Sequence, residues 1–82
     1  IRPGVPVEAQ DEHDLLWIRD AFLDSAVDHG VTVVHGHTPV EAPVVRANRI
    51  GLDTGAVFSG VLTAAAIAPG EAPVILQATA PR

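Results

Sequence analysis

The sequence contains no cysteine, methionine, tyrosine or lysine. Without cysteine the chain can form neither a disulfide nor a thiolate metal site, so histidine and carboxylate side chains are the strong metal ligands that remain. The five basic residues are all arginine and stand against ten acidic residues, which gives a formal charge of −5. This balance leaves no excess of basic surface, so we expect neither a nucleic acid nor an anionic membrane as a partner.

Long apolar runs are also absent. The longest, from Val61 to Pro69, is interrupted by Thr63 and falls far short of the ~20 residues that a membrane helix needs. The opening residues resemble neither a signal peptide nor a transit peptide, so we expect a cytoplasmic protein. The chain has 82 residues and no initiator methionine at Ile1. A domain of this size would bury only roughly 60% of its unfolded surface, and we expect a portion of something longer.

One amphipathic helix is predicted. Prolines at positions 3 and 6 make the first ten residues irregular or extended. Apolar residues then recur at spacings of three or four, at Leu15, Ile18, Phe22 and Ala26. Asp11 suits the N-cap and Gly30 suits the stop, so the pattern predicts a helix over Glu12–Asp28.

The rest of the chain has β character. Val31–His35 is typical of a short buried strand, and Val44–Arg46 and Arg49–Asp53 are expected to pair across the turn at Ala47 and Asn48. The runs Val61–Ala68 and Val74–Ala78 flank Pro69 and Gly70, which suit a type II turn and predict a hairpin. The fold class is therefore α/β, with one helix followed by a mostly antiparallel sheet.

Two histidines follow the first predicted strand, in the segment His35-Gly36-His37. Imidazoles at a strand end beside a tight loop are a common arrangement in metal sites. From residue types alone, however, a partly buried strand histidine and a hydrogen-bonded loop histidine explain the pattern better.

Several motifs in order resemble one family. These are Trp17-Ile18-Arg19, Gly36-His37-Thr38-Pro39, Asn48 to Ala56 and Gly60-Val61-Leu62-Thr63. They resemble the calcineurin-like metallophosphoesterases, in the branch of the bacterial and phage serine/threonine protein phosphatases. The resemblance spans nearly the whole chain and implies that residues 1–82 are the carboxyl-terminal portion of that family's four-layer sandwich.

The resemblance implies a role for individual residues. His37 matches a ligand of a two-metal centre that holds Mn²⁺, Fe or Zn²⁺, whereas His35 matches a strand residue near that site. Arg19 matches a phosphate-clamping arginine, for which its planar guanidinium is suited; the alternative is a surface arginine paired with acidic neighbours. Asp53 matches a loop residue that supports the site without binding metal. His37, Arg19 and the loop Asp53–Ala56 are expected to meet at one rim.

The implied parent activity is metal-dependent hydrolysis of phosphoric monoesters, on a phosphorylated protein or a small phosphoester. A diadenosine tetraphosphate hydrolase is the alternative enzyme, and a non-catalytic structural or interaction module is the alternative of another class. The family's amino-terminal motifs Gly-Asp-x-x-Asp and Gly-Asn-His-Glu have no counterpart here. We therefore expect the 82-residue chain alone to be inactive, and its partner to be the missing amino-terminal half or a second copy.

Overall fold

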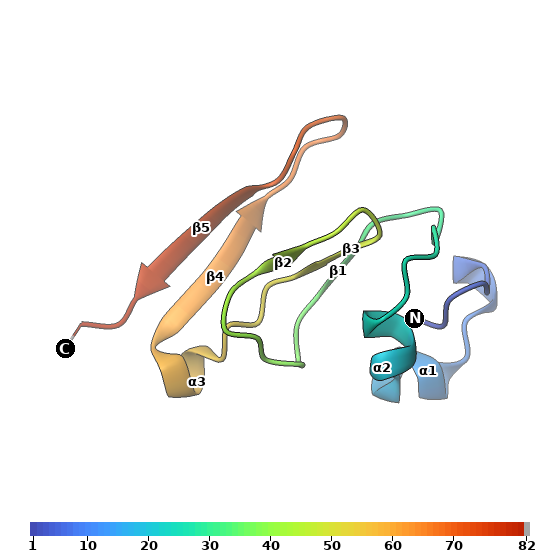
Figure 1. Ribbon diagram of the computed structural model, residues 1–82, viewed down its shortest axis with the longest axis horizontal. Coiled ribbons are helices and arrows are strands. Elements are labelled where there is room, and N and C mark those ends of the chain that lie inside the picture. The colour runs from blue at the N-terminus through green and yellow to red at the C-terminus, as the bar shows by residue number, and fades with distance from the viewer. Residues whose placement is uncertain (82) are drawn as a thin grey trace.

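The computed structural model describes residues 1–81, which form an elongated molecule of 45 × 29 × 18 Å. The amino-terminal helices lie at one end, a three-stranded sheet lies in the middle and a long hairpin, preceded by a further short helix, forms the other end (Figure 1). This is a mixed α/β fold in which most strand pairs are antiparallel, as predicted. None of the helices in this part of the chain has the length and apolarity to cross a membrane.

The prediction of one helix over Glu12–Asp28 is wrong. Two short helices, α1 (Glu12–Trp17) and α2 (Asp20–Leu23), are separated at Arg19, whose backbone has φ −129° and ψ −96°. Beyond α2, the side-chain amide of Asn48 donates to the carbonyl oxygens of Ser25 and Val27, at 2.7 and 3.1 Å. These contacts hold the segment in a non-helical path. An isolated short helix is marginal in water, so tertiary contacts decide where it ends.

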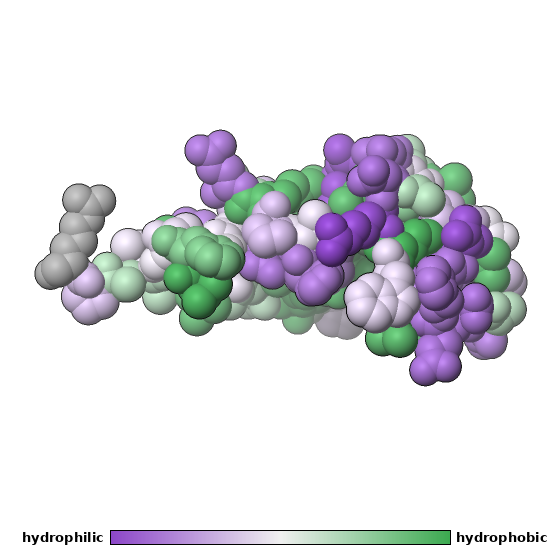
Figure 2. Space-filling model, turned by 90° about the horizontal axis from the view of Figure 1, so that it is seen from below, coloured by the Kyte–Doolittle hydropathy of each residue, from purple (hydrophilic) through white to green (hydrophobic). Residues whose placement is uncertain are grey.

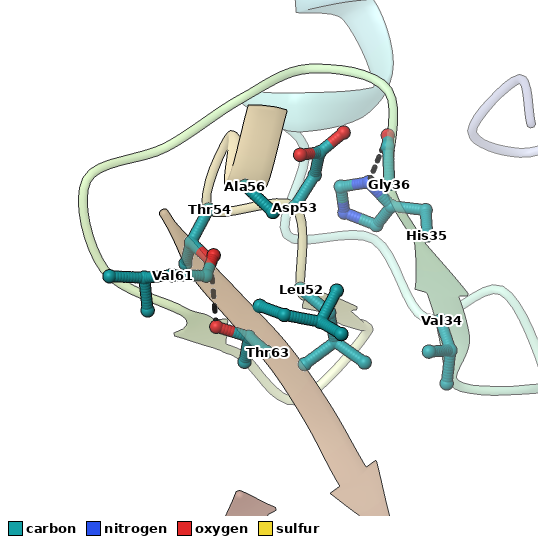
Figure 3. A pocket seen from close by; sticks show the side chains of 10 residues that line it. Val34, His35, Gly36, Leu52, Asp53, Thr54, Ala56, Val61 and Thr63 are labelled. Atoms are coloured by element: carbon teal, nitrogen blue, oxygen red, sulfur yellow. Dashed lines mark hydrogen bonds between the residues drawn. The ribbon is translucent and has the colours of Figure 1, made fainter. Parts of the chain in front are cut away.

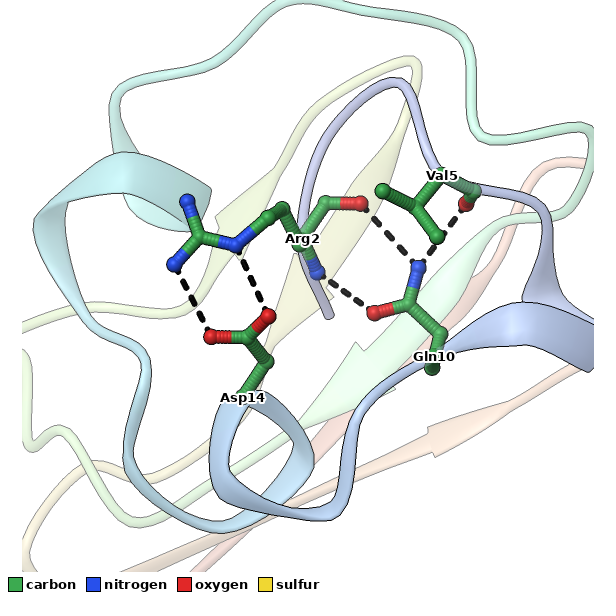
Figure 4. Close-up of polar contacts among 4 residues, drawn as sticks. All are labelled: Arg2, Val5, Gln10 and Asp14. Atoms are coloured by element: carbon green, nitrogen blue, oxygen red, sulfur yellow. Dashed lines mark hydrogen bonds and ion pairs between the residues drawn. The ribbon is translucent and has the colours of Figure 1, made fainter.

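The first ten residues are irregular, as predicted, apart from a 3₁₀ turn, η1 (Val7–Ala9). Gln10 fixes their path, because its side-chain amide donates to the carbonyl oxygens of Arg2 and Val5 and accepts from the Arg2 amide (Figure 4). The Arg2 guanidinium also donates a hydrogen bond to each carboxylate oxygen of Asp14, at 2.7 and 2.9 Å. The hydrogen bonds from Arg2 lower the pKa of the Asp14 carboxyl. Asp11 occupies the N-cap of α1 without a side-chain capping bond.

The central sheet has the strand order β1-β3-β2, with β1 (Val33–His35) parallel to β3 (Arg49–Gly51) and β2 (Val44–Val45) antiparallel to it. The predicted turn between β2 and β3 is confirmed. All three residues of the central strand β3 are buried. By contrast, β1 is an edge strand and Val34 is 46% exposed, which corrects the prediction of a buried strand.

The predicted hairpin is confirmed in β4 (Val61–Ala66) and β5 (Val74–Thr79). In its turn, Gly70 has φ +75° and the Glu71 amide donates to the Ala68 carbonyl at 3.2 Å, as a type II turn requires. A short helix before β4, α3 (Ala56–Ser59), was not predicted. It lies between Gly55 and Gly60, which both adopt left-handed backbone conformations.

The core is small. Among residues 1–81, the buried hydrophobic side chains are Phe22 and Ile50, each 5% exposed. Many large apolar side chains are exposed instead, with Phe58 at 90% and Val57 at 87%, and Figure 2 shows apolar groups interspersed with polar ones on the face that it draws. This amount of uncovered apolar surface is typical of a face that packs against another protein segment.

Candidate functional site

The candidate site lies where β1 and β3 end. His37 follows β1 and Gly36, and its φ of +71° is the single positive value among the non-glycine residues of the described chain. A left-handed conformation costs an L-residue roughly 1–3 kcal/mol and persists only where the surroundings impose it. The Thr38 amide donates to the Gly36 carbonyl at 2.9 Å, which tightens the loop around His37.

Asp53, two residues beyond β3, holds this loop. One oxygen of its carboxylate, Oδ2, accepts the His37 amide at 2.9 Å, and the other, Oδ1, accepts the Gly55 amide at 3.0 Å. The main-chain oxygen of Asp53 accepts the Val40 amide at 2.8 Å. In Figure 3 the carboxylate lies beside Gly36, where an added Cβ would stand 3.7 Å from Oδ2. The structure thus brings two of the predicted site segments together.

Two hollows flank the end of β1. One, of about 460 Å³, is lined by His35, Gly36 and Asp53 together with Leu52, Thr54 and Thr63 (Figure 3). In its wall the Thr54 hydroxyl donates to the Val61 carbonyl at 2.6 Å and lies 2.8 Å from the Thr63 hydroxyl. The other hollow, of about 220 Å³, lies between the helices and β1, and His37 borders it with Ile18 and Phe22. His37 therefore lies close to the helical end of the molecule.

Sequence reasoning missed the contact between His35 and Arg49. Arg49 is 5% exposed because β3 is the central strand. Its Nη1 donates to His35 Nε2 at 3.0 Å, and its Nε is buried with no hydrogen-bond partner among residues 1–81. Arg46 is exposed, and its guanidinium donates to the Leu23 carbonyl at 3.0 Å.

The contact with Arg49 fixes the state of His35. A guanidinium can only donate, so His35 Nε2 accepts, and Nδ1 carries the hydrogen of the neutral ring. Burial, with Arg49 as a smaller contribution, lowers the pKa of His35 and favours that neutral form. The ring also packs edge-on against Phe22, with centroids 5.2 Å apart. His35 is therefore a packed strand residue, in agreement with its expected place beside the site.

Arg19 lies at the N-cap of α2 with an exposed side chain. Within the part of the chain that the structure describes, its guanidinium forms no hydrogen bond or ion pair, and Asp14 pairs with Arg2 instead. Its neighbour Ile18 borders the same hollow as His37, but Arg19 does not line it. The adjacent Trp17 is 63% exposed.

The donor set decides how far this chain fits a metal centre. No group of three or more His, Asp or Glu side chains comes together within residues 1–81 in a way that could hold a metal ion. A two-metal centre needs several such donors and a bridging group. The described residues therefore do not fit a complete two-metal centre by themselves.

Comparison with known proteins gives a short local likeness. The chain is 53% identical over 32 residues to the asymmetrical bis(5'-nucleosyl)-tetraphosphatase PrpE of Geobacillus thermodenitrificans (strain NG80-2), and equally to that of Geobacillus sp. (strain WCH70). Each match covers 39% of this chain and 13% of the relative. No protein-family model and no solved structure matches the chain. The matched 32 residues are therefore similar to part of a hydrolase of the phosphoesterase class.

Proposed function

We propose that this chain is the carboxyl-terminal portion of a metal-dependent phosphoesterase, in which it contributes one metal ligand and part of the phosphate-binding rim. The observation that carries the proposal is the 53% identity to two bis(5'-nucleosyl)-tetraphosphatases, combined with the Gly36-His37-Thr38-Pro39 motif at the end of β1. The exposed apolar side chains on α1 and α3 support it too, since they leave faces for further segments to cover.

In this proposal His37 binds a divalent ion such as Mn²⁺, Fe or Zn²⁺ through a neutral imidazole. The other ligands would come from outside residues 1–81, because these residues lack a complete donor set. Arg19 is exposed and directly follows Ile18, which lines the hollow beside His37. Its guanidinium would bind phosphate oxygens. Asp53 would hold the loop without binding the ion.

Two substrate classes follow from two observations. The likeness to the tetraphosphatases favours a dinucleoside tetraphosphate. The order of the Trp17-Ile18-Arg19 and Gly36-His37-Thr38-Pro39 motifs favours a phosphoserine or phosphothreonine protein. The assay uses the chain together with any segment that its gene encodes upstream of Ile1, which we call the full-length protein. Measuring the hydrolysis of each substrate by this protein in the presence of Mn²⁺ distinguishes the two classes. If the protein hydrolyses neither of these two substrates and does not hydrolyse p-nitrophenyl phosphate either, the phosphoesterase proposal is refuted and the interaction module is favoured.

The 82-residue chain by itself should not hydrolyse p-nitrophenyl phosphate, even when Mn²⁺ is titrated in. One imidazole cannot fix two ions about 3.5–4 Å apart, and no cluster among residues 1–81 supplies the other donors. The assay compares the purified chain with its His37→Ala variant. Turnover that the wild-type chain shows and the variant lacks would contradict this prediction and would indicate a centre assembled by self-association.

A further inference from the structure

The Asp53 carboxylate accepts hydrogen bonds from the backbone amides of two residues that have positive φ. The amide that reaches Oδ2 belongs to His37, at φ +71°, and the amide that reaches Oδ1 belongs to Gly55, at φ +67°. Both residues have a left-handed backbone conformation. Glycine adopts this conformation freely, but histidine does not, so the conformation of His37 needs support from its surroundings.

The same residue also closes the loop at its far end. The main-chain oxygen of Asp53 accepts the Val40 amide at 2.8 Å, while the side chain accepts the His37 amide. The segment from His37 to Val40 is therefore anchored at both ends on one residue. Beyond the carboxylate, an added Cβ on Gly55 would stand 3.7 Å from the Cβ of Pro39, so the loop also lies against the start of α3.

We propose that Asp53 is a positioning residue, which imposes the left-handed backbone at His37 and so fixes where the His37 imidazole is presented. A carboxylate suits this role because it accepts at both oxygens and offers no hydrogen that would repel an amide. Asparagine keeps one acceptor and places an N–H₂ group against the other amide. The role deepens the proposed function and rests on it for its catalytic consequence, but not for its structural one.

The test measures amide hydrogen exchange at His37 in the full-length protein. Loss of a hydrogen bond to a charged acceptor should speed His37 exchange by about tenfold to a hundredfold in Asp53→Ala. Exchange at Ile50, buried in the centre of the sheet, should stay unchanged. Asp53→Asn should fall between the wild type and Asp53→Ala, because one of the two acceptors remains.

Asp28 provides the matched control. Its Oδ1 accepts the Gly30 amide at 2.7 Å, in the same local turn geometry that links Asp53 to Gly55. Asp28→Ala removes the hydrogen bond of this turn, and Asp28 has no hydrogen bond to His37. Amide hydrogen exchange at His37 should therefore stay unchanged in this variant. Unchanged His37 exchange in Asp53→Ala would overturn the proposal, and so would equal acceleration at Ile50, since that would indicate a general loss of stability.

The catalytic consequence is read separately. If the full-length protein hydrolyses phosphoesters, Asp53→Ala should lower kcat more than it changes KM, and Asp28→Ala should change neither. An unchanged kcat in a variant with fast His37 exchange would overturn the catalytic part of the role. If the wild-type protein shows no hydrolysis, the proposed function fails, while the exchange at His37 still decides whether Asp53 imposes the loop conformation.

Discussion

Replacing Phe22 with alanine should cost about 3–5 kcal/mol of unfolding free energy, as is usual for removing a buried aromatic ring. The ring is 5% exposed and packs edge-on against His35, stacks on His29 at 5.7 Å and lies 6.0 Å from the Arg49 guanidinium carbon. An 82-residue domain has an unfolding free energy of roughly 4–12 kcal/mol, so the variant should lose a large part of it. Urea unfolding followed by far-ultraviolet circular dichroism measures the change.

Phe58 provides the control for this substitution. It is the same residue type but is 90% exposed on α3, so Phe58→Ala should change the unfolding free energy by no more than about 0.5 kcal/mol. Equal losses in the two variants would mean that the packing of α2 against the sheet is not what holds the fold. A larger loss in Phe58→Ala would mean that the α3 face is covered in solution.

Replacing His37 with alanine should abolish most phosphoester hydrolysis in the protein that contains the complete metal centre. Even a residue that only supports a metal ligand is worth roughly 10- to 100-fold in affinity or activity, and loss of a ligand should cost at least that. Turnover is measured against Mn²⁺ concentration. His13→Ala, which removes an exposed imidazole from α1, should leave the rate and the Mn²⁺ dependence unchanged. Full activity in His37→Ala would remove His37 from the site.

Arg19→Ala should slow the same reaction by about 10²- to 10³-fold, equivalent to about 2–4 kcal/mol of transition-state stabilisation. A lysine at this position keeps the charge but not the paired donors, so Arg19→Lys should recover only part of the rate. The measurement compares kcat and KM for the three proteins. If all three agree, Arg19 is a surface residue without a part in phosphate binding.

The local features of this protein could be predicted from its residues. The type II turn at Pro69 and Gly70 and the turn at Asn48 depend on the backbone preferences of a few adjacent residues, and both appear where they were predicted. The β-branched runs likewise predicted each strand within a few residues. The motif at His37 predicted its loop, and the pairing of β1 with β3 carries this loop to Asp53.

The position of the break in the helical segment and the burial of particular polar residues depend on long-range packing. The apolar spacing from Leu15 to Ala26 fits one long helix, but spacing does not reveal whether a surface exists to cover it. In the structure Phe22 is buried on the sheet while Trp17 is exposed, and Asn48, 23 residues beyond Ser25 in the chain, binds the segment after α2. Arg49 is buried because β3 became the central strand. These outcomes depend on contacts between residues distant in the sequence, and their energies exceed the small preferences that adjacent residues express.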